Sequence, residues 1–277
     1  MREFLKKHTE RSLPQKGVTF FYVTLYGNYL ISSVIVSFFI ILLLILFCTG
    51  ASFIQRVTGF GFGIFIMTFL PHIMPSYGEA TTLSGLLAMV QSLVIVYKWR
   101  HIIVWKKLHI ILTAFIITSY FSVKCISTLD EKTLKHILGI TLILVSLYFL
   151  FFKERISISP HATNQLGLGS LSGVMGGLFA MQGPPAVLYF LSVADKKEEY
   201  LVLTQMYFLI GNVIMSAFRM GEGYMTKAVL WAWCLALVGV FIGQIIGRMV
   251  FNKMSVTMLR KTSYAYMAVS GCIALLS

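Results

Sequence analysis

The chain has 277 residues, of which 57% are hydrophobic and only 12% are charged, and its mean hydropathy is +0.82. A soluble domain carries about 25% charged residues, so this composition excludes a soluble protein and indicates a multi-pass helical protein of the cell membrane. The net charge of +13 does not indicate nucleic-acid binding, because cations such as Lys98, Arg100 and Lys106 lie in short loops beside apolar segments, where they orient the chain and contact anionic lipid.

The first predicted element is a basic N-terminal tail with an apolar, interfacial stretch, residues 1–28. The apolar run after it is longer than a signal-peptide core and has no convincing small-residue cleavage site, so we expect a retained span. A first transmembrane repeat is predicted over residues 29–152, a polar linker over 153–164 and a second repeat over 165–277.

Each repeat contains five apolar segments in the same order, and the second segment of each is short and broken by glycine or proline. The segments are 29–53, 59–74, 80–97, 108–127 and 134–152, followed by 166–180, 184–193, 201–218, 228–249 and 259–276. Gly63 matches Gly183 and Ser84 matches Thr204 at one shift of 120 residues. The predicted fold is an all-α polytopic membrane protein of two homologous helix repeats, with about eight to ten membrane segments.

The two broken segments are the feature that bears most on function. Gly59-Phe60-Gly61-Phe62-Gly63 interrupts the first repeat, and Gln182-Gly183-Pro184-Pro185 interrupts the second. Within a membrane such breaks require protein or a water-filled cavity to satisfy the freed backbone groups, and paired breaks in two halves point to a transport site. If the broken pieces are re-entrant, the repeats are parallel; if they cross the membrane, the repeats are inverted. The distribution of Lys and Arg does not distinguish these topologies.

The charges near the breaks favour a small anion as the ligand. All ten acidic residues are predicted at segment ends or in loops, so an intramembrane carboxylate relay is not expected. Arg56 is the charge nearest a break, and its guanidinium suits an oxyanion. Helix N-termini after each break add oriented N–H groups. The alternative for Arg56 is an interfacial anchor that extends to the headgroups.

Polar residues on the helices after each break complete the predicted site. Ser84 and Gln91 are seven residues apart, as are Gln205 and Asn212, so each pair lies on one helical face. Such residues also serve as hydrogen bonds between helices, which is the alternative interpretation. The predicted substrate-binding residues are Arg56, Gly59, Gly61, Gly63, Ser84, Gln91, Ser92, Gln182, Gly183, Pro184, Thr204, Gln205 and Asn212.

No catalytic, metal or cofactor site is predicted. The four cysteines are scattered singly, and the histidines show no ligand spacing. The glycines at 59, 61 and 63 lack the strand and acidic partner of a dinucleotide loop. Gly239, Gly243 and Gly247 form a ladder of small residues that predicts close packing of two helices.

The paired motifs resemble the sulfite exporter TauE/SafE family of probable membrane transporters. That family carries two copies of a helix that ends in a GxGGG-like signature, followed by proline in the second copy. The matching positions are Gly59, Gly61 and Gly63, then Gly176, Gly177, Gly183 and Pro184, with Ser84, Thr204, Ser92 and Asn212 on the helices that follow. The resemblance extends from about residue 35 to the C-terminus, although Phe60, Phe62, Met181 and Gln182 replace small residues.

This resemblance implies transport of sulfite, organosulfonates or related small anions. The sequence therefore predicts a secondary transporter or facilitator that is not an enzyme. Its expected partners are a small anionic substrate and membrane lipid, and an oligomer is compatible with the sequence. An anion channel and a membrane scaffold or receptor that transports nothing are the alternatives.

Overall fold

The computed structural model describes residues 38–130 and 158–255, together with 132–134, 136–137, 140–141, 144, 257–258, 261–262 and 265. The chain divides into two units, residues 1–43 and 44–277. Of the first unit, only the helical residues 38–43 are described, and the helices from α3 to α11 all belong to the second unit. The predicted N-terminal tail, most of the last segment of each repeat and part of the linker lie outside the described residues.

The described residues are mostly helical and contain no strand. A helix over Phe38–Thr58 is followed by α3 (Phe62–Ile66), α4 (Leu70–Ile73), α5 (Tyr77–Trp99), α6 (His109–Thr128), α8 (Ala162–Phe179), α9 (Gly183–Val193), α10 (Lys197–Gly221) and α11 (Lys227–Asn252). The helices long and apolar enough to cross a membrane are Phe38–Thr58, Tyr77–Ile102, α6, α10 and α11. These helices agree with the multi-pass membrane protein that the composition predicts.

Two boundaries differ from the sequence prediction because packing extends the helices past their apolar cores. The first helix was expected to end at residue 53 but continues to Thr58, since Gln55 and Arg56 are buried against other helices. Likewise α10 runs to Gly221 and takes in Arg219, which was expected in a loop. Sequence hydropathy ends a span at its first polar residues, whereas a bundle interior accepts polar residues that find partners.

The helix starts follow from local side-chain chemistry. The hydroxyl of Ser76 accepts a hydrogen bond from the Glu79 N–H at the start of α5, and Thr226 accepts one from the Val229 N–H at the start of α11. Proline occupies the first turns of α4 and α9. A proline is tolerated there because the first N–H groups of a helix have no intrahelical partner.

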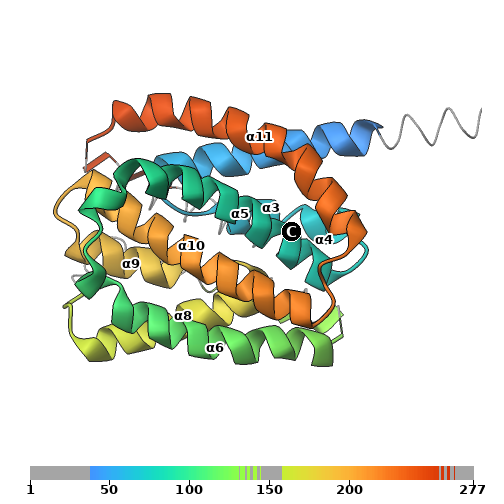
Figure 1. Cartoon of the computed structure of the whole chain (residues 1–277), viewed down its shortest axis with the longest axis horizontal. Coiled ribbons are helices and arrows are strands. Elements are labelled where there is room, and N and C mark those ends of the chain that lie inside the picture. Colours follow the sequence, from blue (N-terminus) through green and yellow to red (C-terminus); the bar gives the residue numbers. More distant parts are fainter. Residues whose placement is uncertain are drawn as a thin grey trace, which may run out of the picture. The chain divides into compact units, whose positions relative to one another are not determined.

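Helices α5 and α10 pack against each other and run antiparallel in the centre of this unit (Figure 1). Arg219, near the end of α10, donates to the Thr81 carbonyl near the start of α5. Ser92, near the end of α5, donates to the Gln205 side chain near the start of α10. The C-terminal ends of these two helices therefore lie at opposite ends of the bundle.

Two glycine ladders bring neighbouring helices into backbone contact. A Cβ on Gly239 would lie 2.3 Å from the Ile45 carbonyl oxygen, and one on Gly243 would lie 2.3 Å from that of Thr49. On α8, a Cβ on Gly169 would lie 2.4 Å from the Ile111 carbonyl oxygen of α6. Only hydrogen fits at these distances, so the close packing expected of the α11 ladder is confirmed, and α8 carries a second ladder that was not predicted.

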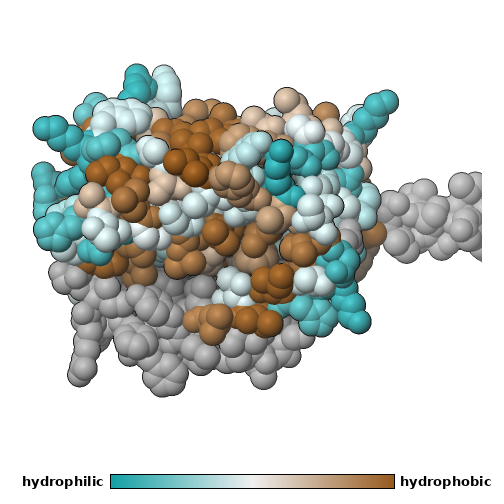
Figure 2. All heavy atoms as spheres, turned by 90° about the horizontal axis from the view of Figure 1, so that it is seen from below, coloured by the Kyte–Doolittle hydropathy of each residue, from teal (hydrophilic) through white to brown (hydrophobic). Residues whose placement is uncertain are grey.

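The face shown in Figure 2 has hydrophobic residues across its middle and hydrophilic residues gathered toward its two ends. Large apolar side chains such as Leu171, Phe121 and Ile117 are more than half exposed. An apolar zone of this kind is costly in water and suits contact with lipid tails.

Candidate substrate site at the helix breaks

The first break is a short irregular segment whose freed carbonyls are bound by α10. Gly59 has φ +87° and Gly61 has φ +98°, left-handed values that glycine adopts without steric cost. The Tyr200 hydroxyl donates to the Thr58 carbonyl at 2.8 Å, and the Gln205 amide donates to the Gly59 carbonyl at 2.6 Å. Side chains of the second half thus satisfy backbone groups of the first.

The second break begins where α8 ends at Phe179, and Ala180 adopts the left-handed conformation with φ 56°. This conformation costs a non-glycine residue about 1–2 kcal/mol. The Ser172 hydroxyl donates to the Gln182 carbonyl at 2.5 Å. The Arg219 guanidinium donates to the Gly176 carbonyl at 2.9 Å and to the Gly177 carbonyl at 3.0 Å. A cation thereby sits at the negative end of the α8 dipole.

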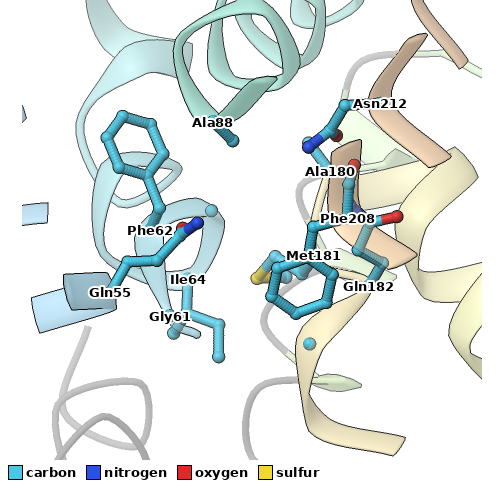
Figure 3. A pocket seen from close by; sticks show the side chains of 12 residues that line it. Gln55, Gly61, Phe62, Ile64, Ala88, Ala180, Met181, Gln182, Phe208 and Asn212 are labelled. Carbon is cyan, nitrogen blue, oxygen red and sulfur yellow. The ribbon is translucent and has the colours of Figure 1, made fainter. Parts of the chain in front are cut away.

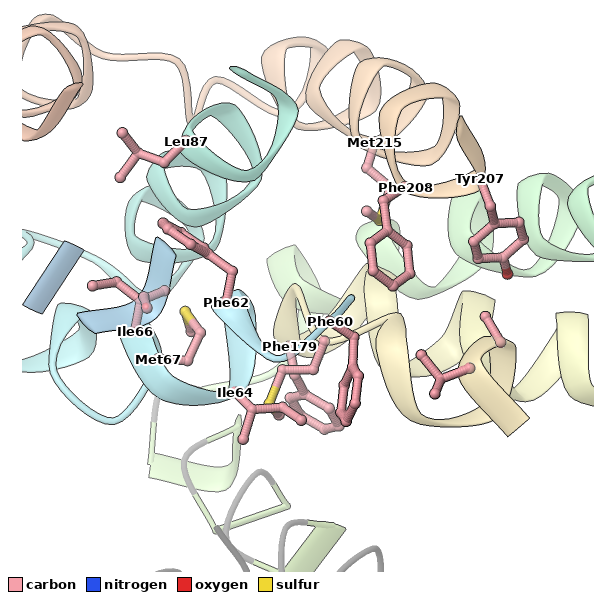
Figure 4. Close-up of a cluster of buried hydrophobic side chains, with 14 of the residues drawn as sticks. Phe60, Phe62, Ile64, Ile66, Met67, Leu87, Phe179, Tyr207, Phe208 and Met215 are labelled. Atoms are coloured by element: carbon pink, nitrogen blue, oxygen red, sulfur yellow. The ribbon is translucent and has the colours of Figure 1, made fainter. Parts of the chain in front are cut away.

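The two breaks touch each other. A Cβ placed on Gly63 would lie 2.1 Å from the Ala180 carbonyl oxygen, and one on Gly183 would lie 3.2 Å from the Phe60 ring. Phe60, Phe62 and Phe179 are buried in one hydrophobic cluster drawn in Figure 4. Gly63 and Gly183 are 120 residues apart in the sequence. Their two segments nevertheless share one packed interface.

A small polar cavity lies at this interface (Figure 3). It is lined by Gln55, Gly61, Phe62, Gly63, Ile64, Ala88, Ala180, Met181, Gln182, Gly183, Phe208 and Asn212, and its volume is about 20 Å³. A space of this size holds about one water molecule. Sulfite has four heavy atoms, so the breaks must separate before any such anion enters.

The N–H groups at the two helix starts differ in number. Neither α3 nor α9 receives a side-chain cap at its N-terminus. Pro184 and Pro185 occupy the first turn of α9, and proline has no N–H. The second break therefore presents fewer backbone donors than the prediction of two matching helix N-termini assumed.

Five of the predicted site residues line the cavity: Gly61, Gly63, Gln182, Gly183 and Asn212. The Asn212 side chain is 2% exposed and its Nδ2 has no hydrogen-bond partner. In Figure 3 this nitrogen is on the side of the amide that faces the gap between the breaks. The cavity also takes in Gln55 and Ala88, which were not predicted, although Ala88 is one helical turn after Ser84.

Other predicted residues are engaged in bonds that hold helices together. The Gln205 side-chain oxygen accepts from Gln55 at 2.9 Å and from Ser92 at 2.8 Å. Gln91 donates to the Ser52 carbonyl, and Thr204 donates within α10 to the Tyr200 carbonyl. For Gln205, Ser92 and Gln91 the structure displays the bonding between helices that was the alternative interpretation, whereas the Thr204 hydroxyl bonds within its own helix. Ser84, Gly59 and Pro184 are not among the residues that line the cavity.

Arg56 does not line the cavity. Its guanidinium carbon lies 5.2 Å from the centre of the Trp99 ring and 5.4 Å from that of Phe251, and the residue is 3% exposed. This is an aromatic cage for a cation. The predicted contact between Arg56 and substrate would require the side chain to leave this cage.

Arg219 is the residue that sequence reasoning missed. It is 0% exposed and reaches the end of α8 beside the second break. The sequence does contain a pattern that indicates its burial. Gln205, Asn212, Ser216 and Arg219 are separated by seven, four and three residues, so Arg219 lies on the same helical face as the polar residues of the predicted site. Arg219 therefore lies beside the second break, although the sequence analysis named only Arg56.

Among the described acidic residues, only Glu79 is buried, at 7% exposure. It lies in the first turn of α5, where a negative charge is favourable to the helix dipole. It does not line the cavity. The cavity lining contains no acidic residue and no basic one.

A helical protein with several apolar membrane-length helices, and with two irregular segments that meet around a polar cavity, has the construction of a membrane transport protein. The family model described as sulfite exporter TauE/SafE matches residues 42–273. The chain therefore belongs to the sulfite exporter TauE/SafE family, which confirms the resemblance drawn from the glycine and proline motifs. No significant match to the chain is found among curated proteins or among solved structures.

Proposed function

We propose that the protein carries a small sulfur-containing anion, sulfite or an organosulfonate, across the cell membrane through the cavity where the two breaks meet. The observation that carries this proposal is the lining: both breaks contribute to it, three side-chain amides face it, and it has no carboxylate. The family points to the same substrate class. A cation substrate would call for carboxylates at this position.

The chemistry of the lining suits an anion that must be both bound and released. Neutral amides replace part of a hydration shell without the strong attraction of a buried opposite charge. Asn212 has an unpartnered Nδ2, and Gln182 has an unpartnered Oε1. Gln182 Nε2 donates to the Phe208 carbonyl at 3.4 Å, and its second N–H is the donor that an anion can use. We infer that Gln55, Gln182 and Asn212 supply the direct contacts.

The arrangement of the helices supports inverted repeats, the topology that the sequence left open. α5 and α10 are counterparts at the 120-residue shift, since Ser92 matches Asn212, and they pack antiparallel. The two ladder interfaces also correspond, since α11 packs on the first long helix as α8 packs on α6. In this proposal the two copies cross the membrane in opposite directions around the central cavity.

Transport requires the closed cavity to open, and the proposed movement is a separation of one break from the other. Close approaches at Gly63 and Gly183 hold the breaks together directly. The hydrogen bonds from Tyr200 and Gln205 tie the first break to α10. Arg219 and Gln182 tie the second break to α10 as well, so we infer that separation of the breaks disrupts one of these two sets of hydrogen bonds.

Flux through reconstituted proteoliposomes tests the proposal. Radiolabelled sulfite uptake is expected to saturate and to accelerate when unlabelled sulfite is loaded inside, which is counterflow. Flux without saturation or counterflow would indicate a channel. No flux of sulfite, thiosulfate or organosulfonates above protein-free liposomes would refute transport of these anions and leave the scaffold as the remaining interpretation.

Arg56 requires its own variant. If Arg56 leaves its cage to bind substrate, Arg56→Ala abolishes flux. If its role is only to stack on Trp99 and Phe251, the variant loses stability in detergent and the folded fraction transports normally.

A further inference from the structure

We propose that Arg219, Asn212 and Ser216 form an anion-binding position over Gly85, next to the central cavity, that takes the negative charge of the substrate. This inference rests on the proposed transport of a small anion. Its ligand class is an oxyanion such as sulfite or the sulfonate group of a larger substrate.

The first observation is a buried positive charge that has no negative partner among the described residues. Arg219 is fully buried, and the ion pairs found in that part of the chain are Lys107 with Glu199 and Lys197 with Glu198. Its guanidinium donates to three carbonyls, those of Thr81, Gly176 and Gly177. Carbonyl dipoles do not cancel a full charge, and a buried charge without a partner is costly. An anion at this point would offset that cost.

The second observation is a group of three polar side chains around one glycine, each of which has an atom without a hydrogen-bond partner. Measured from the Cβ position that Gly85 lacks, Arg219 Nη1 lies at 3.2 Å, Asn212 Oδ1 at 3.7 Å and Ser216 Oγ at 3.8 Å. Arg219 Nε, Asn212 Nδ2 and Ser216 Oγ have no hydrogen-bond partner. Buried polar atoms are satisfied in the great majority of cases, so three unpartnered atoms on neighbouring side chains are compatible with a missing ligand. Asn212 turns its Oδ1 toward this point, and a half-turn of the amide would move its Nδ2 from the cavity side to the Gly85 side.

The third observation comes from the equivalent place in the other half. At the 120-residue shift, Gln205 corresponds to Gly85 and Asn212 corresponds to Ser92. The Gln205 amide fills its side of the interface and bonds Ser92, Gln55 and the Gly59 carbonyl. Gly85 has no side chain to do the same, so the donors on its side are left for a ligand. The Gln205 side chain supplies a hydrogen-bond acceptor in the second half, and Gly85 supplies none at the equivalent position in the first half. A ligand could take the place of the missing acceptor.

The position is continuous with the central cavity. Asn212 lines the cavity and also lies beside Gly85. Ala88, three residues after Gly85 on α5, lines the cavity as well. An anion in the widened cavity would therefore be separated from Arg219 only by the Asn212 side chain. Arg219 Nε has no hydrogen-bond partner and is the charged donor that remains for an oxygen of a sulfite or sulfonate group.

A purely structural role for Arg219, in which it only caps the end of α8, makes a different prediction. Such a role would change the stability of the protein and leave the affinity of the folded fraction for an anion unchanged. Ser216→Ala leaves the helix cap in place and removes one neutral donor, whereas Gly85→Ala keeps Arg219 but places a methyl group 3.2 Å from its Nη1. The matched control is Gly167→Ala on α8, where a Cβ would meet nothing within 4 Å.

The experiment is calorimetric titration of the full-length protein in detergent with sodium sulfite, alongside sulfite flux in proteoliposomes. Arg219→Lys is expected to weaken sulfite binding about 10- to 150-fold, the range for hydrogen bonds to charged groups. Ser216→Ala and Gly85→Ala are expected to weaken it about 3- to 10-fold. Gly167→Ala should bind as the wild type does.

The outcomes separate this inference from the proposed function. If Ser216→Ala and Gly85→Ala bind sulfite like the wild type while the wild type transports it, the position over Gly85 is refuted and transport stands. If the wild type binds sulfite with the expected pattern among the variants but shows no flux, the position stands and transport is refuted. These two variants decide the matter even if Arg219→Lys does not fold.

Discussion

Gly63→Ala is the substitution that probes the contact between the two breaks most directly. The added methyl carbon would lie 2.1 Å from the Ala180 carbonyl oxygen and 3.1 Å from its carbon. Ordinary contact is about 3.5 Å, so the methyl carbon and the carbonyl oxygen must move apart by about 1.4 Å. Overpacking of this kind costs about 1–3 kcal/mol, and we place it at the upper end because a backbone atom cannot rotate away.

The consequence for transport follows from that displacement. The cavity has a volume of only about 20 Å³ and Gly63 is in its lining, so a methyl group at this position alters both the contact between the breaks and the space for substrate. We expect sulfite flux to fall at least about tenfold, the factor that corresponds to 1.4 kcal/mol. Detergent-solubilised protein is expected to unfold at a lower temperature than the wild type.

Gly167→Ala is the matched control, because it makes the same chemical change on α8 where a Cβ meets nothing within 4 Å. Alanine is favoured over glycine inside a helix by about 0.5–1 kcal/mol, so this variant should keep full flux and gain stability. Wild-type flux and thermal stability in Gly63→Ala would refute the reasoning, since the breaks would then not pack as described.

Three further predictions concern the breaks and the topology. Gln205→Leu removes the donor to the Gly59 carbonyl and leaves that buried carbonyl unsatisfied. We expect thermal unfolding in detergent to show a loss of stability of about 1–3 kcal/mol. Unchanged stability would contradict this prediction. Ala180→Gly relieves the left-handed strain at φ 56° and should stabilise the protein by about 1 kcal/mol in the same assay, whereas destabilisation would count against strain. In a variant free of native cysteines, His101→Cys and Gly223→Cys should react with an impermeant maleimide from opposite sides of the membrane, and labelling from the same side would refute inverted repeats.

The positions of the long helices could be predicted because they depend on hydrophobic length, a local property of the sequence. α5, α6 and α11 begin and end within a few residues of the expected segments. The end of the first long helix could not be placed this way, because Gln55 and Arg56 are stabilised by residues more than 40 positions away, among them Trp99 and Gln205.

The residues of the candidate site differ in the same way, because some could be predicted from the local sequence and others only from tertiary packing. Gly61, Gly63 and Gln182 were recognised because glycine, and a polar residue beside proline, break an apolar pattern. The roles of Gln205 and Ser92 could not be assigned, since a buried amide serves equally for binding or for holding helices, and only the position of its partner decides. Arg219 was misplaced because a charged residue near the end of a span resembles a loop residue until tertiary packing buries it.

Counterflow of radiolabelled sulfite in proteoliposomes tests the proposed transport most directly. We predict saturable uptake that accelerates with sulfite inside the vesicles and that falls at least about tenfold in Gly63→Ala but not in Gly167→Ala. Uptake no greater than that of protein-free liposomes, for sulfite and for organosulfonates alike, would contradict transport of these anions through the cavity between the breaks.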